Sequence, residues 1–157
     1  SLIIGRPLTS EDVEPLTWAL IEKGRTEGGA AYLSAVAQHQ LIGRLVAGVM
    51  LDGQFDLIMT PTLATVPPKL GHFDQNGPDP MDAMLKAREI ATFTGIFNAT
   101  GQPAISVPME MSEEGLPIGI QFVAPMWGEH VLIQLAGELE RAHPWIGRRA
   151  PGVLDAG

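Results

Sequence analysis

The chain has 157 residues, of which 45% are hydrophobic, and it carries a formal net charge of −8 at pH 7. This length suits one domain, in which roughly 70% of the surface of the unfolded chain is buried on folding. The acidic balance argues against a nucleic-acid partner, and no apolar run is long enough to span a membrane. The absence of cysteine excludes disulfides, thiolate metal sites and a cysteine nucleophile, and it suits a cytoplasmic protein.

Residues 1–52 are expected to form a helical region. One helix is predicted to begin near Pro15, because the first helical turn tolerates a residue without an N–H. A second is predicted over residues 30–50. Apolar residues recur in that segment at intervals of four: Leu33, Ala37, Leu41, Leu45 and Val49. So wide an apolar stripe predicts a helix that is packed on more than one side, and the following Asp52-Gly53 is typical of a turn.

Residues 53–157 are expected to contain strands, a pocket loop and a closing helix, and together with the helical region to make a single domain. In chain order we expect a strand over 55–59, a Pro- and Gly-rich loop to residue 80, a helix over 81–92, strands over 104–107 and 118–123, and a helix over 129–142. A loop of this length inside a compact domain is usually functional or mobile. Short strands interleaved with helices predict an α/β fold in which helices cover a sheet.

Three blocks of sequence carry a resemblance to a known family. Residues 93–125 read FTGIFNATGQPAISVPMEMSEEGLPIGIQFVAP, residues 55–71 read FDLIMTPTLATVPPKLG, and the closing helix leads into Pro-Trp at residues 144–145. In this order and at these intervals the blocks resemble the C-terminal portion of the amidase signature family, which are serine hydrolases of carboxamides. The resemblance implies a partial mixed β-sheet covered by helices, one part of a larger sheet.

The chain lacks the catalytic motifs of that family, namely a lysine, a bridging serine and a nucleophilic serine after a Gly-Gly-Ser-Ser run. Amide hydrolysis needs a nucleophile, a base and donors that face the oxyanion. The serines here, none of them in a Gly-rich turn, are Ser1, Ser10, Ser34, Ser106 and Ser112. Ser1 would be a nucleophile only in the class that uses its own α-amine, and a bare N-terminal serine is no motif for that class. We therefore expect no catalytic residue, and the four histidines lack a metal-binding spacing.

The resemblance implies that Phe93, Thr94, Phe97 and Asn98 belong to the wall of the substrate pocket. The loop over residues 60–72 is a second candidate wall. Other readings of the same residues stay open, because buried aromatic side chains mostly serve core packing and asparagine tolerates the left-handed backbone of turns.

We expect the chain to be the C-terminal part of an amidase that hydrolyses the C–N bond of small-molecule carboxylic amides, giving acid and ammonia or amine, without a cofactor. One alternative is a non-catalytic binding module or a split-enzyme partner. Another is an amidotransferase-type subunit. The glutamine-hydrolysing branch commonly has an Asp where this chain has Ala91, so the ammonium group of glutamine would lack its charge partner here. Open strand edges and an uncovered apolar face predict self-association or domain swapping of the chain on its own.

Overall fold

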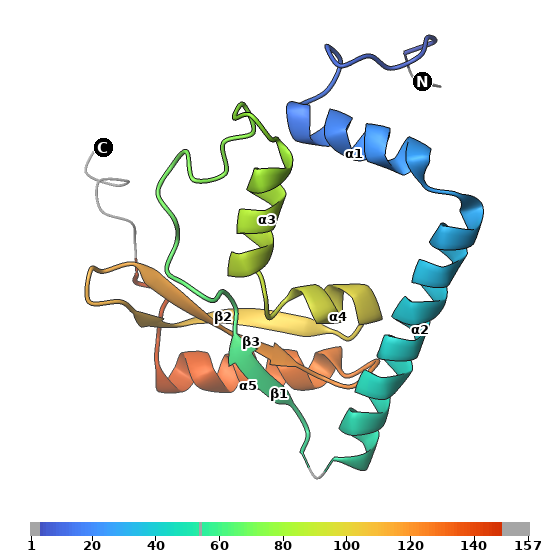
Figure 1. Cartoon of the computed structure of the whole chain (residues 1–157). Helices are drawn as coiled ribbons and strands as arrows, with labels where there is room; N and C mark the ends of the chain where they lie inside the picture. The colour runs from blue at the N-terminus through green and yellow to red at the C-terminus, as the bar shows by residue number, and fades with distance from the viewer. Residues whose placement is uncertain (1–3, 54, 149–157) are drawn as a thin grey trace.

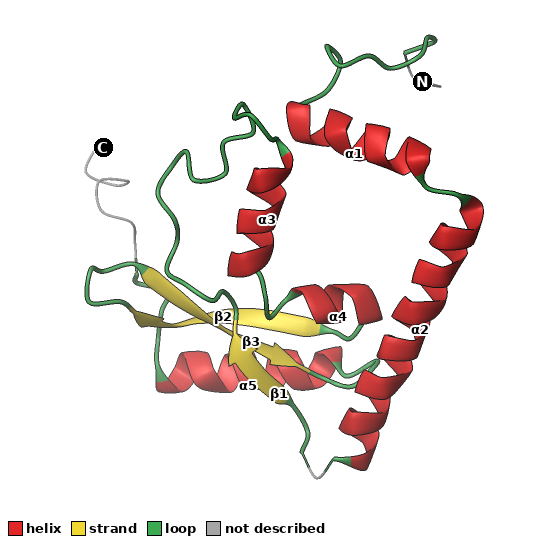
Figure 2. Ribbon diagram, viewed as in Figure 1, coloured by secondary structure: helices red, strands yellow, loops and turns green. Residues whose placement is uncertain are grey.

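The computed structural model of the chain describes residues 4–53 and 55–148. Its elements in chain order are α1 (Pro15–Thr26), α2 (Gly29–Asp52), β1 (Ile58–Pro61), α3 (Met81–Ile90), α4 (Gly95–Thr100), β2 (Ala104–Met111), β3 (Pro117–Val123) and α5 (Glu129–Ala142). In Figure 1 the sheet lies between α4 and α5. Helix α2 lies beside this unit, and α1 precedes α2. Figure 2 shows the long loop that connects β1 to α3. No helix in the described ranges is long and apolar enough to cross a membrane.

The long second helix forms as predicted, but its packing differs from the prediction. α2 has 24 residues, and among them Met50 is the buried one. Large apolar side chains on the same helix remain mostly exposed: Tyr32 69%, Leu33 67%, Leu45 61% and Leu51 78%. The expectation of a helix packed on more than one side is therefore wrong for this chain. The apolar periodicity of a helix shows how wide its apolar face is, but not which elements cover that face.

The three strands form one antiparallel sheet in the order β1-β3-β2. Both edge strands meet the same end of β3, since Ile58 and Ala104 each stand opposite Val123. The parallel pairing that a mixed sheet requires does not occur among the described strands. The sheet is nevertheless covered by helices as the α/β prediction requires.

The first strand begins three residues later than predicted. Phe55 folds back onto the turn that follows α2, and its ring lies 2.3 Å from the position that a Cβ on Gly53 would occupy. The backbone becomes extended only from Ile58 onward. The second strand continues past its predicted end to Met111, with a shift of register after Pro108. Proline is tolerated in a strand at an edge or a bulge, and β2 provides both.

The short helix α4 was not among the predicted elements. It has six residues and ends at Gly101, whose φ of +83° is in the left-handed region that glycine adopts freely. Asn98 lies inside this helix, so the reading that its side chain serves a left-handed turn is wrong. A helix of about one and a half turns is too short to show a periodic apolar pattern in the sequence, and its stability comes from tertiary packing.

That packing is a small core cluster on one face of the sheet. Met50 of α2, Phe97 of α4 and Val123 of β3 are at most 7% exposed and lie in one group, with Val46 and Ile58 packed beside them. The cluster joins two helices to the central strand. Burying such side chains contributes about 1.5–3 kcal/mol each relative to leaving them exposed.

The last helix covers the opposite face of the sheet. Side chains alternate along a strand, so Val107 of β2 points away from the face that carries Val123. Val107 and Leu132 of α5 are each 3% exposed. Leu135, Ala136 and Leu139 lie on the same face of α5 as Leu132 and are half-buried.

We expect Met50→Ala to lower the free energy of unfolding by about 2–5 kcal/mol, because it removes a buried side chain from the cluster that joins α2 to the sheet. Leu51→Ala is the matched control, since the neighbouring leucine is 78% exposed and its loss should change stability by no more than about 0.5 kcal/mol. Urea denaturation measures both variants. Equal midpoints for the two would contradict this placement of the core.

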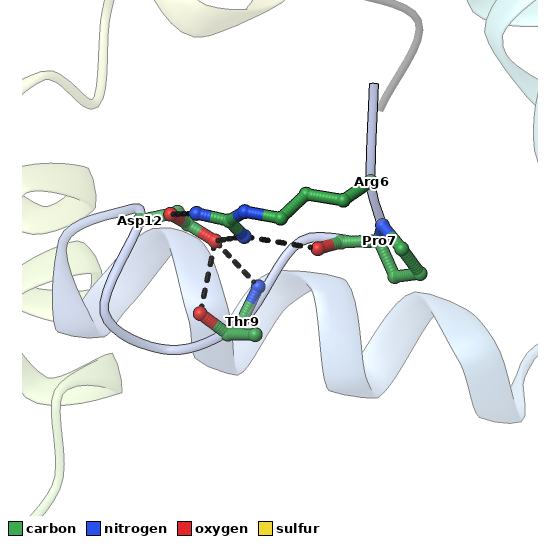
Figure 3. A network of polar contacts seen from close by, with 4 residues as sticks. All are labelled: Arg6, Pro7, Thr9 and Asp12. Atoms are coloured by element: carbon green, nitrogen blue, oxygen red, sulfur yellow. Dashed lines mark hydrogen bonds and ion pairs between the residues drawn. The ribbon is translucent and has the colours of Figure 1, made fainter. Parts of the chain in front are cut away.

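A network of polar contacts orders the segment before α1 (Figure 3). The Arg6 guanidinium donates two hydrogen bonds to the two carboxylate oxygens of Asp12, at 2.7 and 2.6 Å. The backbone N–H and the hydroxyl of Thr9 donate to the same carboxylate at 2.8 and 2.9 Å. These hydrogen bonds hold the pKa of the Asp12 carboxyl well below its ordinary value of 3.8, and the bond from Arg6 has the largest effect.

A lowered carboxyl pKa means that the network favours the folded segment above pH 3.8 and loses this effect as the pH falls through the pKa of the folded state. We expect Arg6→Ala to bring the pKa of Asp12 back toward 3.8. The exposed Arg25, which pairs with Glu22, supplies the control variant Arg25→Ala, and it should leave the titration of Asp12 unchanged. Carboxyl carbon NMR shifts followed against pH measure both, and an Asp12 titration that ignores Arg6→Ala contradicts the network.

Candidate functional site

A hollow of about 370 Å³ lies where α4 meets the sheet. Its lining residues are Thr94, Phe97, Asn98, Gly101, Gln102, Ala104 and Gln121. Three of the four residues expected in a pocket wall, Thr94, Phe97 and Asn98, therefore line one hollow. The turn and a half of α4 brings these three residues together.

The two phenylalanines differ in what they contribute. Phe97 is 7% exposed and packs in the core with Met50 and Val123, so the core-packing reading describes most of its side chain. Phe93 is half-buried, and its backbone carbonyl accepts a hydrogen bond from Gln121 at 3.4 Å. The segment that carries Phe93 is thus tied to β3 through its main chain.

Gln121 is the polar centre of this region, and the sequence did not single it out. Its side chain is buried, with 5% exposed, and its Nε2 donates to the Thr60 hydroxyl at 3.0 Å as well as to the Phe93 carbonyl. Gln102 is buried to a similar degree, and its Oε1 accepts a hydrogen bond from the Thr100 hydroxyl. Buried polar groups need such partners. The sequence feature that could have indicated this role is a polar residue within a predicted strand, in a fold where helices are expected to cover the sheet.

A second hollow, of about 260 Å³, lies at the start of the loop expected to form the other wall. The residues that line it are Thr62, Leu63, Ala64, Thr65, Val66, Pro117, Ile118 and Gly119. Beside it the Thr62 and Ser106 hydroxyls lie 2.6 Å apart, and a Cβ on Gly119 would come within 2.9 Å of both oxygens. Only glycine at position 119 leaves room for the Thr62 and Ser106 hydroxyls to approach each other here. Gln121 contacts both Thr60 and Phe93, so it connects the two candidate walls.

These hollows offer hydrogen-bonding groups but not a hydrolytic centre. Seven uncharged residues line the larger one, and they supply amide and hydroxyl groups suited to a polar, neutral ligand. The hydroxyl of Ser106 is bonded to that of Thr62, which is no base. In the described part of the chain there is no group of three or more His, Cys, Asp or Glu side chains that could hold a metal. Ser1 lies outside the described residues.

Comparison with known proteins gives the wider context of this site. A family model described as Amidase matches residues 7–133. The 6-aminohexanoate-cyclic-dimer hydrolase of Paenarthrobacter ureafaciens is 35% identical over 158 aligned positions, which cover 98% of this chain and 32% of that protein. The chain therefore spans about a third of the length of the curated relatives that match nearly all of it.

Solved structures match the fold as well. A structure of 6-aminohexanoate cyclic dimer hydrolase superimposes with a TM-score of 0.84 at 34% identity, over 93% of this chain and 31% of the other. A bacterial aryl acylamidase of the amidase signature family gives a TM-score of 0.65 at 24% identity, over 89% of this chain and 30% of that chain. The second likeness shows the fold alone.

We expect Gln121→Leu to lower the free energy of unfolding by about 1–3 kcal/mol, because the Phe93 carbonyl and the Thr60 hydroxyl lose a buried donor. Amide exchange of α4 should rise with it. Gln134→Leu is the control, since this exposed glutamine of α5 bonds to Glu138 at the surface, and its effect should stay within about 0.5 kcal/mol. Exchange in α4 that is equal in the two variants would contradict the role given to Gln121.

Proposed function

Because this chain belongs to the Amidase family, we propose that it is the C-terminal portion of a longer enzyme that hydrolyses the C–N bond of carboxylic amides to acid and ammonia or amine. The observation that carries the proposal is the superposition on 6-aminohexanoate cyclic dimer hydrolase, with a TM-score of 0.84 at 34% identity. Catalysis in this proposal belongs to residues outside the chain. The absence of the lysine and Gly-Gly-Ser-Ser motifs from its sequence supports that division.

In the longer enzyme this chain completes the sheet and supplies part of the substrate-pocket wall. The hollow beside α4 supports this role, because Thr94 and Asn98 line it with uncharged polar groups and Phe97 with an apolar one. A carboxamide is neutral, and it can both donate and accept hydrogen bonds with such groups. Phe93 contributes through the main-chain tie to Gln121, which holds the segment against β3.

The substrate class that we propose is neutral amides, including cyclic ones. The two hydrolases of 6-aminohexanoate cyclic dimer that match nearly the whole chain support it, at 35% and 37% identity. The uncharged Ala91 supports it further, because a pocket for free glutamine would need a carboxylate near the substrate ammonium group. We also place the enzyme in the cytoplasm, in keeping with a chain that has no cysteine.

The exposed apolar face of α2 favours a second candidate, a separate chain that binds a complementary catalytic partner. Leu41, Leu45 and Val49 recur at intervals of four and are 51%, 61% and 58% exposed. Such a face is expected to be covered in the working protein, whether by another part of one polypeptide or by a second chain. For the chain on its own, it supports self-association.

The experiment that tests the proposal begins with the coding DNA upstream of the Ser1 codon, read in frame. We expect it to encode a lysine and then a Gly-Gly-Ser-Ser run. The full-length product should then open the cyclic dimer of 6-aminohexanoate to the linear dimer by hydrolysing one amide bond, or hydrolyse a related neutral amide, while the chain of 157 residues alone should show no activity above a buffer blank.

The control is the full-length enzyme with the nucleophilic serine that follows that run replaced by alanine, and its activity should fall by at least about 10³-fold. A start codon in place of the upstream motifs would overturn the proposal of a longer enzyme and favour the separate binding partner. A full-length enzyme that hydrolyses only glutamine would overturn the proposed substrate class.

A further inference from the structure

The buried side chain of Gln121 has one hydrogen-bonding atom to spare. Its Nε2 donates to the Thr60 hydroxyl at 3.0 Å and to the Phe93 carbonyl at 3.4 Å, while its Oε1 has no hydrogen-bond partner among the described residues. Building on the proposed function, we propose that Gln121 is a substrate-binding residue of the longer enzyme. Its Oε1 accepts a hydrogen bond from an amide N–H of the substrate, and it thereby favours amides that carry an N–H over N-alkylated amides.

The orientation of this carboxamide is fixed by its two partners. A backbone carbonyl only accepts hydrogen bonds, so the Phe93 carbonyl has to face the nitrogen of Gln121 and not its oxygen. The Thr60 hydroxyl donates its single proton to the Pro61 carbonyl at 3.0 Å, and it therefore also accepts from the Gln121 nitrogen. Both hydrogens of Nε2 are engaged in this way, and the acceptor Oε1 is left over.

The spare oxygen belongs to the hollow beside α4. Within residues 4–53 and 55–148, every polar atom of a buried or half-buried side chain that is shut off from solvent has a hydrogen-bond partner. Oε1 has none, so it is open to solvent even though Gln121 as a whole is 5% exposed. Gln121 lines the hollow, whereas Thr60 and Phe93, which hold its nitrogen, do not. The nitrogen therefore points away from the hollow, and the oxygen is the polar atom that this side chain presents to it.

The surroundings of Oε1 select the kind of donor that it receives. The residues that line the hollow are uncharged, so an ammonium group would lose its hydration there without a counter-charge. The N–H of a carboxamide is neutral, and it pairs with a carboxamide oxygen at little cost in desolvation. A substrate nitrogen that carries an alkyl group in place of its hydrogen leaves Oε1 unpaired. Sites that hydrogen-bond a substrate N–H discriminate for this reason against analogues that lack it.

The test is a binding cycle that combines a change in the enzyme with a change in the ligand. The parent is the full-length enzyme whose nucleophilic serine is replaced by alanine, so that ligands bind without being hydrolysed. The ligands are the cyclic dimer of 6-aminohexanoate and its N,N′-dimethyl derivative, which has no N–H, and calorimetry measures the Kd of each. We expect the parent to bind the dimer at least about 10-fold more tightly than the derivative, and this ratio to be at least about fivefold smaller in Gln121→Leu.

The ratio of the two Kd values separates hydrogen bonding from a purely structural role. If Gln121 only holds the two walls together, Gln121→Leu weakens both ligands alike and leaves the ratio unchanged, which would overturn the proposal. Thr60→Val is the matched control, because it removes one anchor of the same carboxamide and keeps Oε1, and its ratio should stay within about twofold of the parent. A ratio lost equally in Thr60→Val would assign the selectivity to the order of the wall instead of Oε1. A parent enzyme that binds both ligands equally would overturn the proposal without any further variant.

The proposed function is tested separately from this role of Gln121. Hydrolysis of the cyclic dimer by the full-length enzyme with its serine intact tests that function before any Kd is measured. An enzyme that hydrolyses the dimer and shows the same ratio with and without Gln121 keeps the proposed function and contradicts only the role given to Oε1. Failure of the parent to bind either ligand overturns cyclic amides as substrates, and the role of Gln121 in binding them falls with it.

Discussion

The two-sided pairing of β3 is the constraint on which the rest of this structure depends. The strand holds β1 and β2 on its two sides. Val123 is fully buried in the cluster that receives α2 and α4, and Gln121, two residues earlier on the same face, holds Thr60 and Phe93. A slip of one residue would exchange these side chains with their neighbours and remove both the core and the hydrogen bonds.

The hollow beside α4 is a consequence of that arrangement. Its polar groups are amides and hydroxyls held by the sheet, and they suit recognition of a neutral polar group. Proton transfer and nucleophilic attack need groups of a different kind, and the sequence motifs for them are absent. In the proposed enzyme, the wall of the substrate pocket and the catalytic groups thus come from different parts of the polypeptide. In the proposed enzyme they meet only when the remaining two thirds folds against this chain.

Particular elements show how far local sequence reasoning reaches. The apolar stripe predicted α2, because a period near 3.6 extends over several of its turns. Local sequence reasoning did not reveal α4, which is too short to show a periodic pattern and is held in place by Phe97 in the core. Local sequence reasoning also did not reveal that α2 is mostly exposed, because apolar periodicity identifies the apolar face of a helix but not which elements pack against it. Thr94, Phe97 and Asn98 were expected in a pocket wall, whereas Gln121 was missed.

By itself, the sequence determined the family, the long helices and the absence of the catalytic motifs, because ordered motifs and periodic patterns are local properties that can be read along the chain. Only the tertiary structure decided which residues share the hollow and which faces stay uncovered. Gln121 and Thr60 are 61 positions apart, and Arg148 and Pro108 are 40 apart. Contacts of such separation depend on how the strands pair and the helices pack, and no local pattern records them.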